Sequence, residues 1–193
     1  MKRASIICMT LAILLLALVP WTLRAETKQA AETKQKDTIA EQEKNSEAQK
    51  KKKLSFETVD IFGNPVSSED LFGEHQVTML NIWTSWCGPC LRELPELEAL
   101  NQEFAEKDCA IVGLLYDGVD EAAIQEAKEI LNETGVTYTV ILPWEGITDV
   151  FAIQAVPTSI FVDQEGNVVG DPVVGALIES YNAGVDAALG STE

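Results

Sequence analysis

The chain has 193 residues and a formal net charge of −17, with 31 Asp and Glu side chains against 14 Lys and Arg. The imbalance is concentrated in residues 54–193, which carry 25 acidic and three basic side chains. A surface this acidic repels a phosphate backbone, so nucleic-acid binding is excluded.

The first 25 residues have the pattern of an export segment. A short basic start, Met1-Lys2-Arg3, is followed by an apolar stretch from Ile6 to Val19 and by a small residue at Ala25. This is the order of regions in a secretory signal. If it is not cleaved, the same stretch is just long enough to serve as a single membrane anchor. The pattern therefore predicts a signal peptide or an N-terminal membrane anchor over residues 1–25, and leaves the choice open.

A charged linker is predicted over residues 26–53. This segment consists almost wholly of Lys, Glu, Gln, Ala, Thr and Asp, and Ile39 is its one sizeable aliphatic side chain. Such a composition cannot bury a core, so we expect a disordered tether. The folded domain is then predicted over residues 54–193.

Within that domain, short apolar runs alternate with amphipathic segments, which indicates an α/β layer structure. A hairpin is predicted at the start, from residues 56–61 through the turn Gly63-Asn64-Pro65. Strands are predicted over residues 77–83, 109–116, 137–142, 159–162 and 168–174. Helices are predicted over residues 90–106, 121–134, 147–152 and 176–189. For the helix over 90–106, periodicity predicts a buried leucine face and places Glu93 with the acidic residues on the opposite, solvated side.

The chemistry-bearing motif is Trp86-Cys87-Gly88-Pro89-Cys90, between a buried strand and an amphipathic helix. The first sulfur is then expected at the helix N-terminus, where free N–H groups and the helix dipole favour a thiolate. The thiolate is the form that attacks disulfides. The second cysteine, one turn further on, is placed to attack the resulting mixed disulfide. The motif predicts Cys87 as the nucleophile and Cys90 as the resolving thiol.

Two other interpretations of the cysteine pair are weaker. A zinc site lacks its second half, because there is no other cysteine pair and His75 is the single histidine. A structural disulfide closing so short a loop would constrain little chain entropy. Cys109 is expected to be a small core residue. We therefore expect no metal and no cofactor beyond the redox-active pair Cys87 and Cys90.

The chain resembles the thioredoxin superfamily, most closely its extracytoplasmic TlpA/ResA-like branch. The resemblance covers residues 56–189 and is carried by the segment Asn81–Cys90, by Pro95, and by Val156-Pro157-Thr158 before a predicted strand. It implies a thioredoxin-like three-layer α/β fold with an N-terminal β-hairpin. It also implies that residues 120–142 form the central helix–strand insertion of that branch.

The resemblance also implies a substrate groove. Pro157 corresponds to the family's cis-proline facing the dithiol, which leaves the backbone of Val156 free to pair with a substrate strand. Of the two tryptophans beside the dithiol, Trp83 is expected to pack in the core and Trp86 to line the groove. The substrate-binding residues predicted in this way are Trp86, Gly88, Pro89, Val156, Pro157 and Thr158.

The sequence departs from the family in its acid/base residue. Cytoplasmic thioredoxins carry a buried aspartate at the position of Asn81, which cannot titrate. The TlpA/ResA-like branch often supplies a buried glutamate after the third core strand, but Gly118 stands at about that place. Asp117, Asp120 and Glu145 are neighbouring candidates, and each fits a solvated loop acid better. The proton-transfer residue is left unassigned.

The resemblance implies a reductase of exported protein disulfides, whose targets in this branch include apocytochrome c cysteines and whose electrons arrive from a membrane thiol donor. We expect the protein to be a monomer. A disulfide-forming oxidant or isomerase is the alternative. A thiol peroxidase is a third possibility, since Thr84-x-x-Cys87 matches part of the peroxiredoxin motif, but Leu80 replaces its proline. The expected location is extracytoplasmic, secreted or anchored to the cell membrane.

Overall fold

The computed structural model describes residues 53–191, so the predictions for the export segment and for linker residues 26–52 lie outside the described residues. The described fold begins one residue before the predicted boundary, because Lys53 forms an isolated antiparallel bridge with Asn167. Across residues 53–191, no helix has the length and apolar character that crossing a membrane requires.

A five-stranded mixed sheet forms the centre of the fold, in the order β5-β4-β3-β6-β7. Neighbouring strands β3, β4 and β5 run parallel, whereas β6 and β7 are antiparallel to their neighbours. The strands span β3 Val77–Trp83, β4 Cys109–Leu115, β5 Val140–Ile141, β6 Thr158–Asp163 and β7 Val168–Val174.

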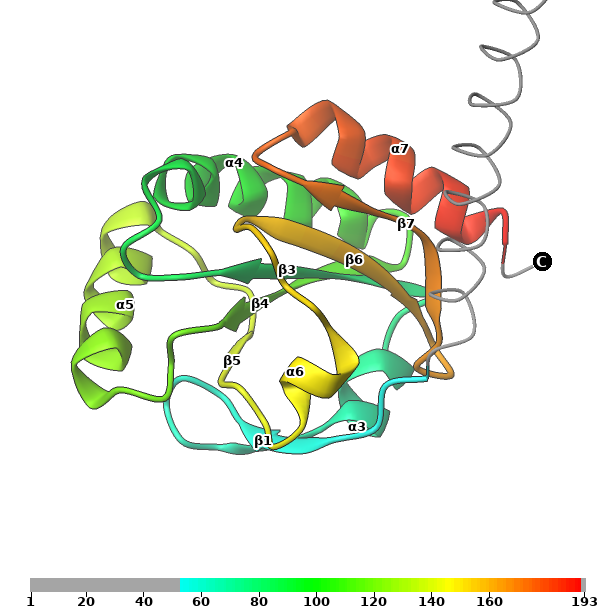
Figure 1. The fold of residues 1–193 in the computed structure, drawn as a ribbon. Coiled ribbons are helices and arrows are strands. Elements are labelled where there is room, and N and C mark those ends of the chain that lie inside the picture. The colour runs from blue at the N-terminus through cyan, green and yellow to red at the C-terminus, as the bar shows by residue number, and fades with distance from the viewer. Residues whose placement is uncertain (1–52, 192–193) are drawn as a thin grey trace, which may run out of the picture. The chain divides into compact units, whose positions relative to one another are not determined.

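Helices cover both faces of this sheet and complete the predicted three-layer α/β arrangement (Figure 1). Helices α4 and α7 lie over one face, and α3, α6 and the N-terminal hairpin lie over the other. Helix α5 lies toward the β5 edge. The helices span α3 Ser68–Gly73, α4 Gly88–Ala105, α5 Glu121–Thr134, α6 Ile147–Val150 and α7 Ile178–Leu189.

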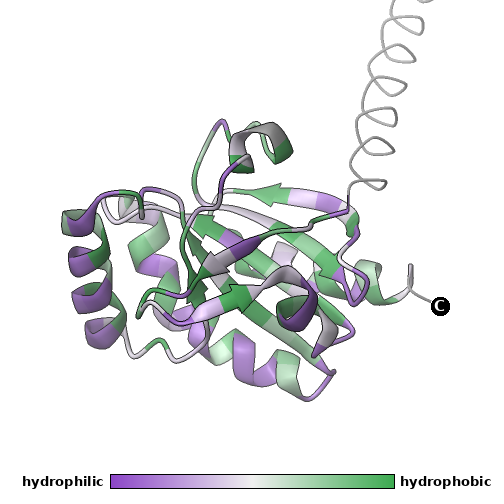
Figure 2. Cartoon of the chain, turned by 90° about the horizontal axis from the view of Figure 1, so that it is seen from below, coloured by the Kyte–Doolittle hydropathy of each residue, from purple (hydrophilic) through white to green (hydrophobic). Residues whose placement is uncertain are grey.

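Strand β3 is buried along its whole length because both of its faces are covered. Its side chains alternate between two cores, as the pleat requires. Met79 and Trp83 pack into the core shared with α4, α5 and α7, whereas Leu80 and Ile82 pack into the core beneath α3 and α6. Figure 2 shows the same layering, with mainly green strands inside and purple segments on the outer sides of the helices. By this alternation Asn81 faces α4.

The predicted N-terminal hairpin is present and protects an edge of the sheet. Strands β1 (Glu57–Val59) and β2 (Pro65–Ser67) pair antiparallel. The amide of Ile61 donates to the carbonyl of Val140 at 2.8 Å, and the amide of Leu142 donates to the carbonyl of Val59 at 3.0 Å. These bonds occupy part of the otherwise open edge of β5, which lowers the risk of edge-to-edge association.

The structure differs from the predicted elements in several places, most of them shifts of one or two residues at an element's end. Strand β5 is shorter than residues 137–142, because the amide of Thr137 donates to the Glu98 carboxylate at 2.7 Å. Helix α6 ends at Val150, two residues before the predicted end. The short helix α3 was not predicted; it begins at a side-chain cap, in which Ser67 accepts from the amide of Asp70.

Candidate active site

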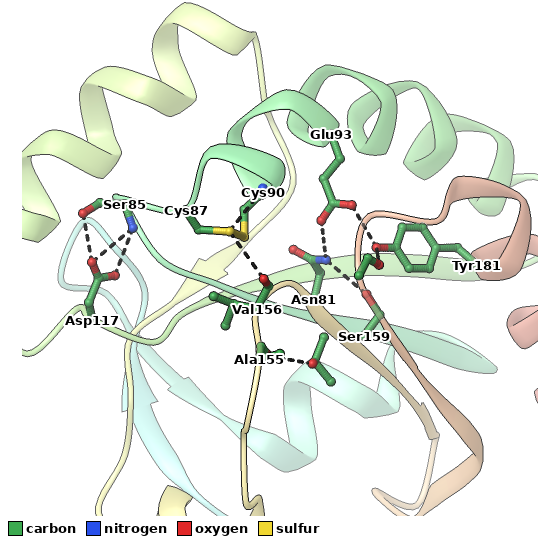
Figure 3. The surroundings of a disulfide bond; sticks show 12 residues. Asn81, Ser85, Cys87, Cys90, Glu93, Asp117, Ala155, Val156, Ser159 and Tyr181 are labelled. Carbon is green, nitrogen blue, oxygen red and sulfur yellow. Dashed lines mark hydrogen bonds between the residues drawn. A yellow bond between two sulfur atoms is a disulfide. The ribbon is translucent and has the colours of Figure 1, made fainter.

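Cys87 and Cys90 form a disulfide at the N-terminus of α4 (Figure 3). Cys87 is the residue that caps the helix, and its Sγ accepts from the amide of Cys90 at 3.3 Å. Cys90 is fully buried, whereas Cys87 keeps 4% of its surface exposed. Of the two sulfurs, that of Cys87 is therefore the one that an incoming thiol or disulfide can reach.

The capping geometry favours negative charge on Cys87. The helix begins at Gly88, two residues before the predicted start, because Cys87 itself supplies the cap. Pro89 lies in the first turn, where its missing N–H is not required. In the reduced protein a thiolate at Cys87 faces unpaired amides and the positive end of the helix dipole. This environment lowers the pKa of a cysteine.

The loop before β6 lies directly against the disulfide. The Val156–Pro157 peptide bond is cis, as the family resemblance implied. The carbonyl oxygen of Val156 lies 3.6 Å from the Sγ of Cys87. Thr158 is buried, and its hydroxyl fixes the loop by donating to the carbonyl of Ala155 at 2.8 Å. Within residues 53–191 the amide of Val156 has no hydrogen-bond partner, so it is available to a bound chain.

The two tryptophans have opposite environments, as predicted. Trp83 is 0% exposed and belongs to the core, whereas Trp86 is 73% exposed beside Cys87. Ser85, the residue before Trp86, is held by the Asp117 carboxylate, which accepts from its amide at 3.1 Å and from its hydroxyl at 2.9 Å. Asp117 therefore fixes the segment that presents Trp86 and Cys87.

Glu93 corrects the sequence interpretation of α4. It was placed on the solvated side of the helix, yet it is only 3% exposed. Figure 3 shows its side chain pointing from α4 toward β3 and α7. The amide nitrogen of Asn81 donates to its Oε1 at 3.1 Å, and the Tyr181 hydroxyl lies 2.8 Å from its Oε2. The same Asn81 nitrogen also donates to the hydroxyl oxygen of Ser159 at 3.1 Å.

The environment of Glu93 suits proton exchange. Burial raises the pKa of Glu93 above its usual value of 4.5, and hydrogen bonds from Tyr181 and Asn81 oppose the shift in part. Glu93 is three residues after Cys90, so the two side chains emerge on the same side of α4. A buried carboxyl with a raised pKa, one turn from a buried thiol, is a candidate to exchange the proton of that thiol.

The other acid candidates are occupied or remote. Asp117 is bound to Ser85, and Asp120 caps α5 by accepting from the amide of Ala122 at 3.0 Å. Glu145 is exposed. At Gly118 a Cβ would lie 2.9 Å from the carbonyl oxygen of Leu115, so this position has no room for a side chain.

A signal for Glu93 was present in the sequence. It lies three residues after Cys90 and four before Leu97, which is the spacing of the buried face of α4. The acids Glu96, Glu98 and Glu103 lie in the same segment, so Glu93 was grouped with them as a solvated residue. The position of Glu93 around the helix therefore indicates its burial more reliably than its charge does.

Cys109 is a free, buried cysteine at the start of β4, and burial raises the pKa of its thiol. No group of three or more metal-ligating His, Cys, Asp or Glu side chains occurs in the described part of the chain.

Comparison with known proteins places this site in a family. Residues 47–170 match the AhpC/TSA family, which is well over half of the chain. The chain belongs to the AhpC/TSA family. This membership agrees with the thioredoxin-like fold and with the cysteine pair at the start of α4.

Individual relatives include a thiol–disulfide oxidoreductase and a thioredoxin-like protein. The chain is 30% identical over 116 residues to the thiol-disulfide oxidoreductase ResA of Bacillus thuringiensis, covering 60% of this chain and 64% of the relative. It is 26% identical to the thioredoxin-like protein YneN of Bacillus subtilis, covering 63% of this chain and 69% of that protein. The match thus spans less than two thirds of the length of the ResA protein and slightly more than two thirds of YneN.

A solved structure agrees over a longer stretch. The crystal structure of a thiol:disulfide interchange protein of the thioredoxin family from Chlorobium tepidum superposes with a TM-score of 0.60 at 26% identity. The superposition covers 72% of this chain and 96% of that protein.

Proposed function

We propose that this protein is a thiol–disulfide oxidoreductase that exchanges disulfides through Cys87 and Cys90. The observation that carries the proposal is the Cys87–Cys90 disulfide at the N-terminus of α4, with Sγ of Cys87 3.6 Å from the carbonyl oxygen of Val156. This places a reactive sulfur, a helix N-terminus and an unpaired backbone amide at one point of the surface. The similarity to the ResA and YneN proteins supports the same activity.

In the reductive direction the reaction has two steps. The Cys87 thiolate attacks one sulfur of a client disulfide; the client S–S bond breaks, and the released client thiolate takes a proton from water. The Cys90 thiol then gives its proton to the Glu93 carboxylate, and the Cys90 thiolate attacks the Sγ of Cys87. The bond between Cys87 and the client breaks, and the second client thiolate also takes a proton from water. The client has gained two electrons and two protons, and the Cys87–Cys90 disulfide has formed.

The client groove runs between Trp86 and the Val156 loop in this proposal. The amide and carbonyl of Val156 pair with an extended client segment, while Trp86, Gly88 and Pro89 contact its side chains. Trp86 supports this role because a large aromatic side chain exposed beside a reactive sulfur is a typical docking residue. Pro157 and Thr158 hold the loop in place.

We assign the reductive direction, an extracytoplasmic location and exported protein clients to the protein on the strength of its motifs. Gly88-Pro89 between the cysteines favours reducing character in this superfamily. The apolar segment of residues 6–19 after a basic start supports export. Apocytochrome c cysteines are a candidate client class, and a membrane thiol donor is the candidate electron source.

The reduction potential of the Cys87–Cys90 pair and an insulin-reduction assay with dithiothreitol test this function. A potential of about −270 mV supports a reductase, whereas one of about −120 mV supports an oxidant. Failure to accelerate insulin reduction contradicts the proposed activity. Consumption of hydrogen peroxide well above the rate of a free thiol, with no insulin reduction, would establish a thiol peroxidase instead.

A further inference from the structure

The hydroxyl of Tyr181 has two acceptors and a single proton to donate. Its oxygen lies 2.8 Å from Oε2 of Glu93 and 2.9 Å from the carbonyl oxygen of Gly175. Tyr181 is fully buried, so water does not compensate an acceptor that is left unpaired. The two contacts are satisfied together only if a second proton is present between these three groups.

The protonation state of Glu93 decides how the contacts are arranged. When Glu93 is a carboxylate, the Tyr181 hydroxyl donates to it in a charge-assisted bond, and the Gly175 carbonyl has no donor from Tyr181. When Glu93 carries a proton on Oε2, it donates to the Tyr181 oxygen, and the Tyr181 proton turns to Gly175. The protonated arrangement satisfies all three groups.

Gly175 connects the switch of the Tyr181 hydrogen bond to the loop of Val156 and Pro157 before β6. Its amide donates to the carbonyl of Pro157 at 2.8 Å, while its own carbonyl faces Tyr181. Gly175 has a φ of 97°, in the left-handed region that favours glycine. The neighbouring side chains Val174 and Leu177 are exposed. The carbonyl that faces Tyr181 therefore belongs to the same residue whose amide holds Pro157.

We propose that Tyr181 is a positioning residue that ties the protonation of Glu93 to the loop holding Pro157. In the reduced protein Tyr181 donates to the Glu93 carboxylate. After the proton of Cys90 has moved to Glu93 and the Cys87–Cys90 disulfide has formed, Tyr181 donates to Gly175 and tightens the loop. This inference rests on the proposed function, because the proton comes from Cys90.

The groups around Glu93 support its role as the titrating member. Tyr181 approaches from α7, Tyr138 from the segment before β5, and Glu96 lies on α4 itself. Strands β3 and β6 contribute the neutral Asn81 and Ser159. Burial raises the pKa of both tyrosines, and the charge of Glu93 adds to this shift. Both tyrosines therefore stay neutral while Glu93 titrates.

The test is a pH titration of the full-length oxidised protein by ¹³C NMR, which follows the Glu93 carboxyl and the Gly175 carbonyl. In the wild type both signals should titrate together. Tyr181→Phe keeps the ring and removes the hydroxyl. It should raise the apparent pKa of Glu93 by about one unit and abolish the response of Gly175. Glu93→Gln, whose amide donates to Tyr181 as the protonated acid does, should hold the Gly175 signal at its low-pH position.

Tyr116→Phe is the matched control, since no side-chain hydrogen bond to the Tyr116 hydroxyl is found within residues 53–191, and it should leave both titrations unchanged. If the Gly175 signal titrates in Tyr181→Phe as it does in the wild type, the inference about Tyr181 is contradicted, and the proposed function is unaffected. An unchanged pH profile of disulfide exchange in Glu93→Gln overturns the proton role in the proposed function, and with it the link to catalysis.

Discussion

The carboxylate of Asp117 accepts from the Ser85 amide at 3.1 Å and from the Ser85 hydroxyl at 2.9 Å, joining the end of β4 to the segment that leads into the dithiol. Ser85 lies two residues before Cys87, so these two hydrogen bonds fix the position of the chain just before the residue that caps α4. Asp117, a candidate proton carrier from the sequence, therefore has a structural role.

Removing the hydrogen bonds between Asp117 and Ser85 should loosen the segment that leads to Cys87. We expect Asp117→Ala to lower the free energy of unfolding by about 1–3 kcal/mol, since it leaves the Ser85 amide without its acceptor. Disulfide exchange should slow as well, because Trp86 and Cys87 lose their support. Urea unfolding and insulin reduction measure the two effects. Asp171→Ala, which removes an exposed acid from β7, is the control for charge and should change neither value.

Trp83 and Trp86 should respond oppositely to truncation. Trp83→Ala empties a fully buried site and should cost about 3–5 kcal/mol of unfolding free energy. Trp86→Ala removes an exposed ring and should change stability by less than about 0.5 kcal/mol. Its effect should appear instead as a raised KM for a protein disulfide. An unaltered KM in Trp86→Ala would argue against the proposed groove.

A packing prediction concerns the contact between α7 and β6. A Cβ added at Gly184 would overlap the ring of Phe161, so the helix and the strand approach each other at a position that admits no side chain. Gly184→Ala should destabilise the domain by about 1–3 kcal/mol, measured by chemical unfolding. Gly190→Ala, whose Cβ would make contacts at 3.7 Å and beyond, is the matched control. Equal stability of the two variants would refute the close approach.

The raised pKa of Glu93 predicts how stability depends on pH. The folded protein binds this proton more tightly than the unfolded chain, whose pKa is near 4.5. The resulting stabilisation is fully present below the unfolded pKa and is lost as pH rises through the folded pKa. Glu93→Gln does not titrate, so its unfolding free energy minus that of the wild type should grow as pH rises from the unfolded pKa through the folded pKa of Glu93. A constant difference would mean that Glu93 keeps an ordinary pKa.

The sequence predicts this fold well wherever a segment has one strong period or one strong motif. Strand β3 and helix α5 were predicted with their observed bounds, because a continuous apolar run and an amphipathic period closed by Gly135 leave little choice. The cysteine motif located the candidate site for the same reason. The cis-proline loop came from the family resemblance.

What could not be predicted depends on contacts between distant segments. Glu93 is buried because Asn81 and Tyr181, 12 and 88 residues away, supply its hydrogen bonds. Strand β5 is short because Thr137 bonds to Glu98 on another element. A charged residue among other acids gives no local sign of such partners.

Trapping with Cys90→Ser tests the central claim most directly. Without its resolving thiol, Cys87 should attack a client and stay bound to it, so mixed disulfides sensitive to dithiothreitol should accumulate on the variant. Cys87→Ser, which keeps the deeper thiol, should trap far less. If Cys90→Ser accumulates no mixed disulfide, or Cys87→Ser traps equally well, the roles assigned to the pair are contradicted.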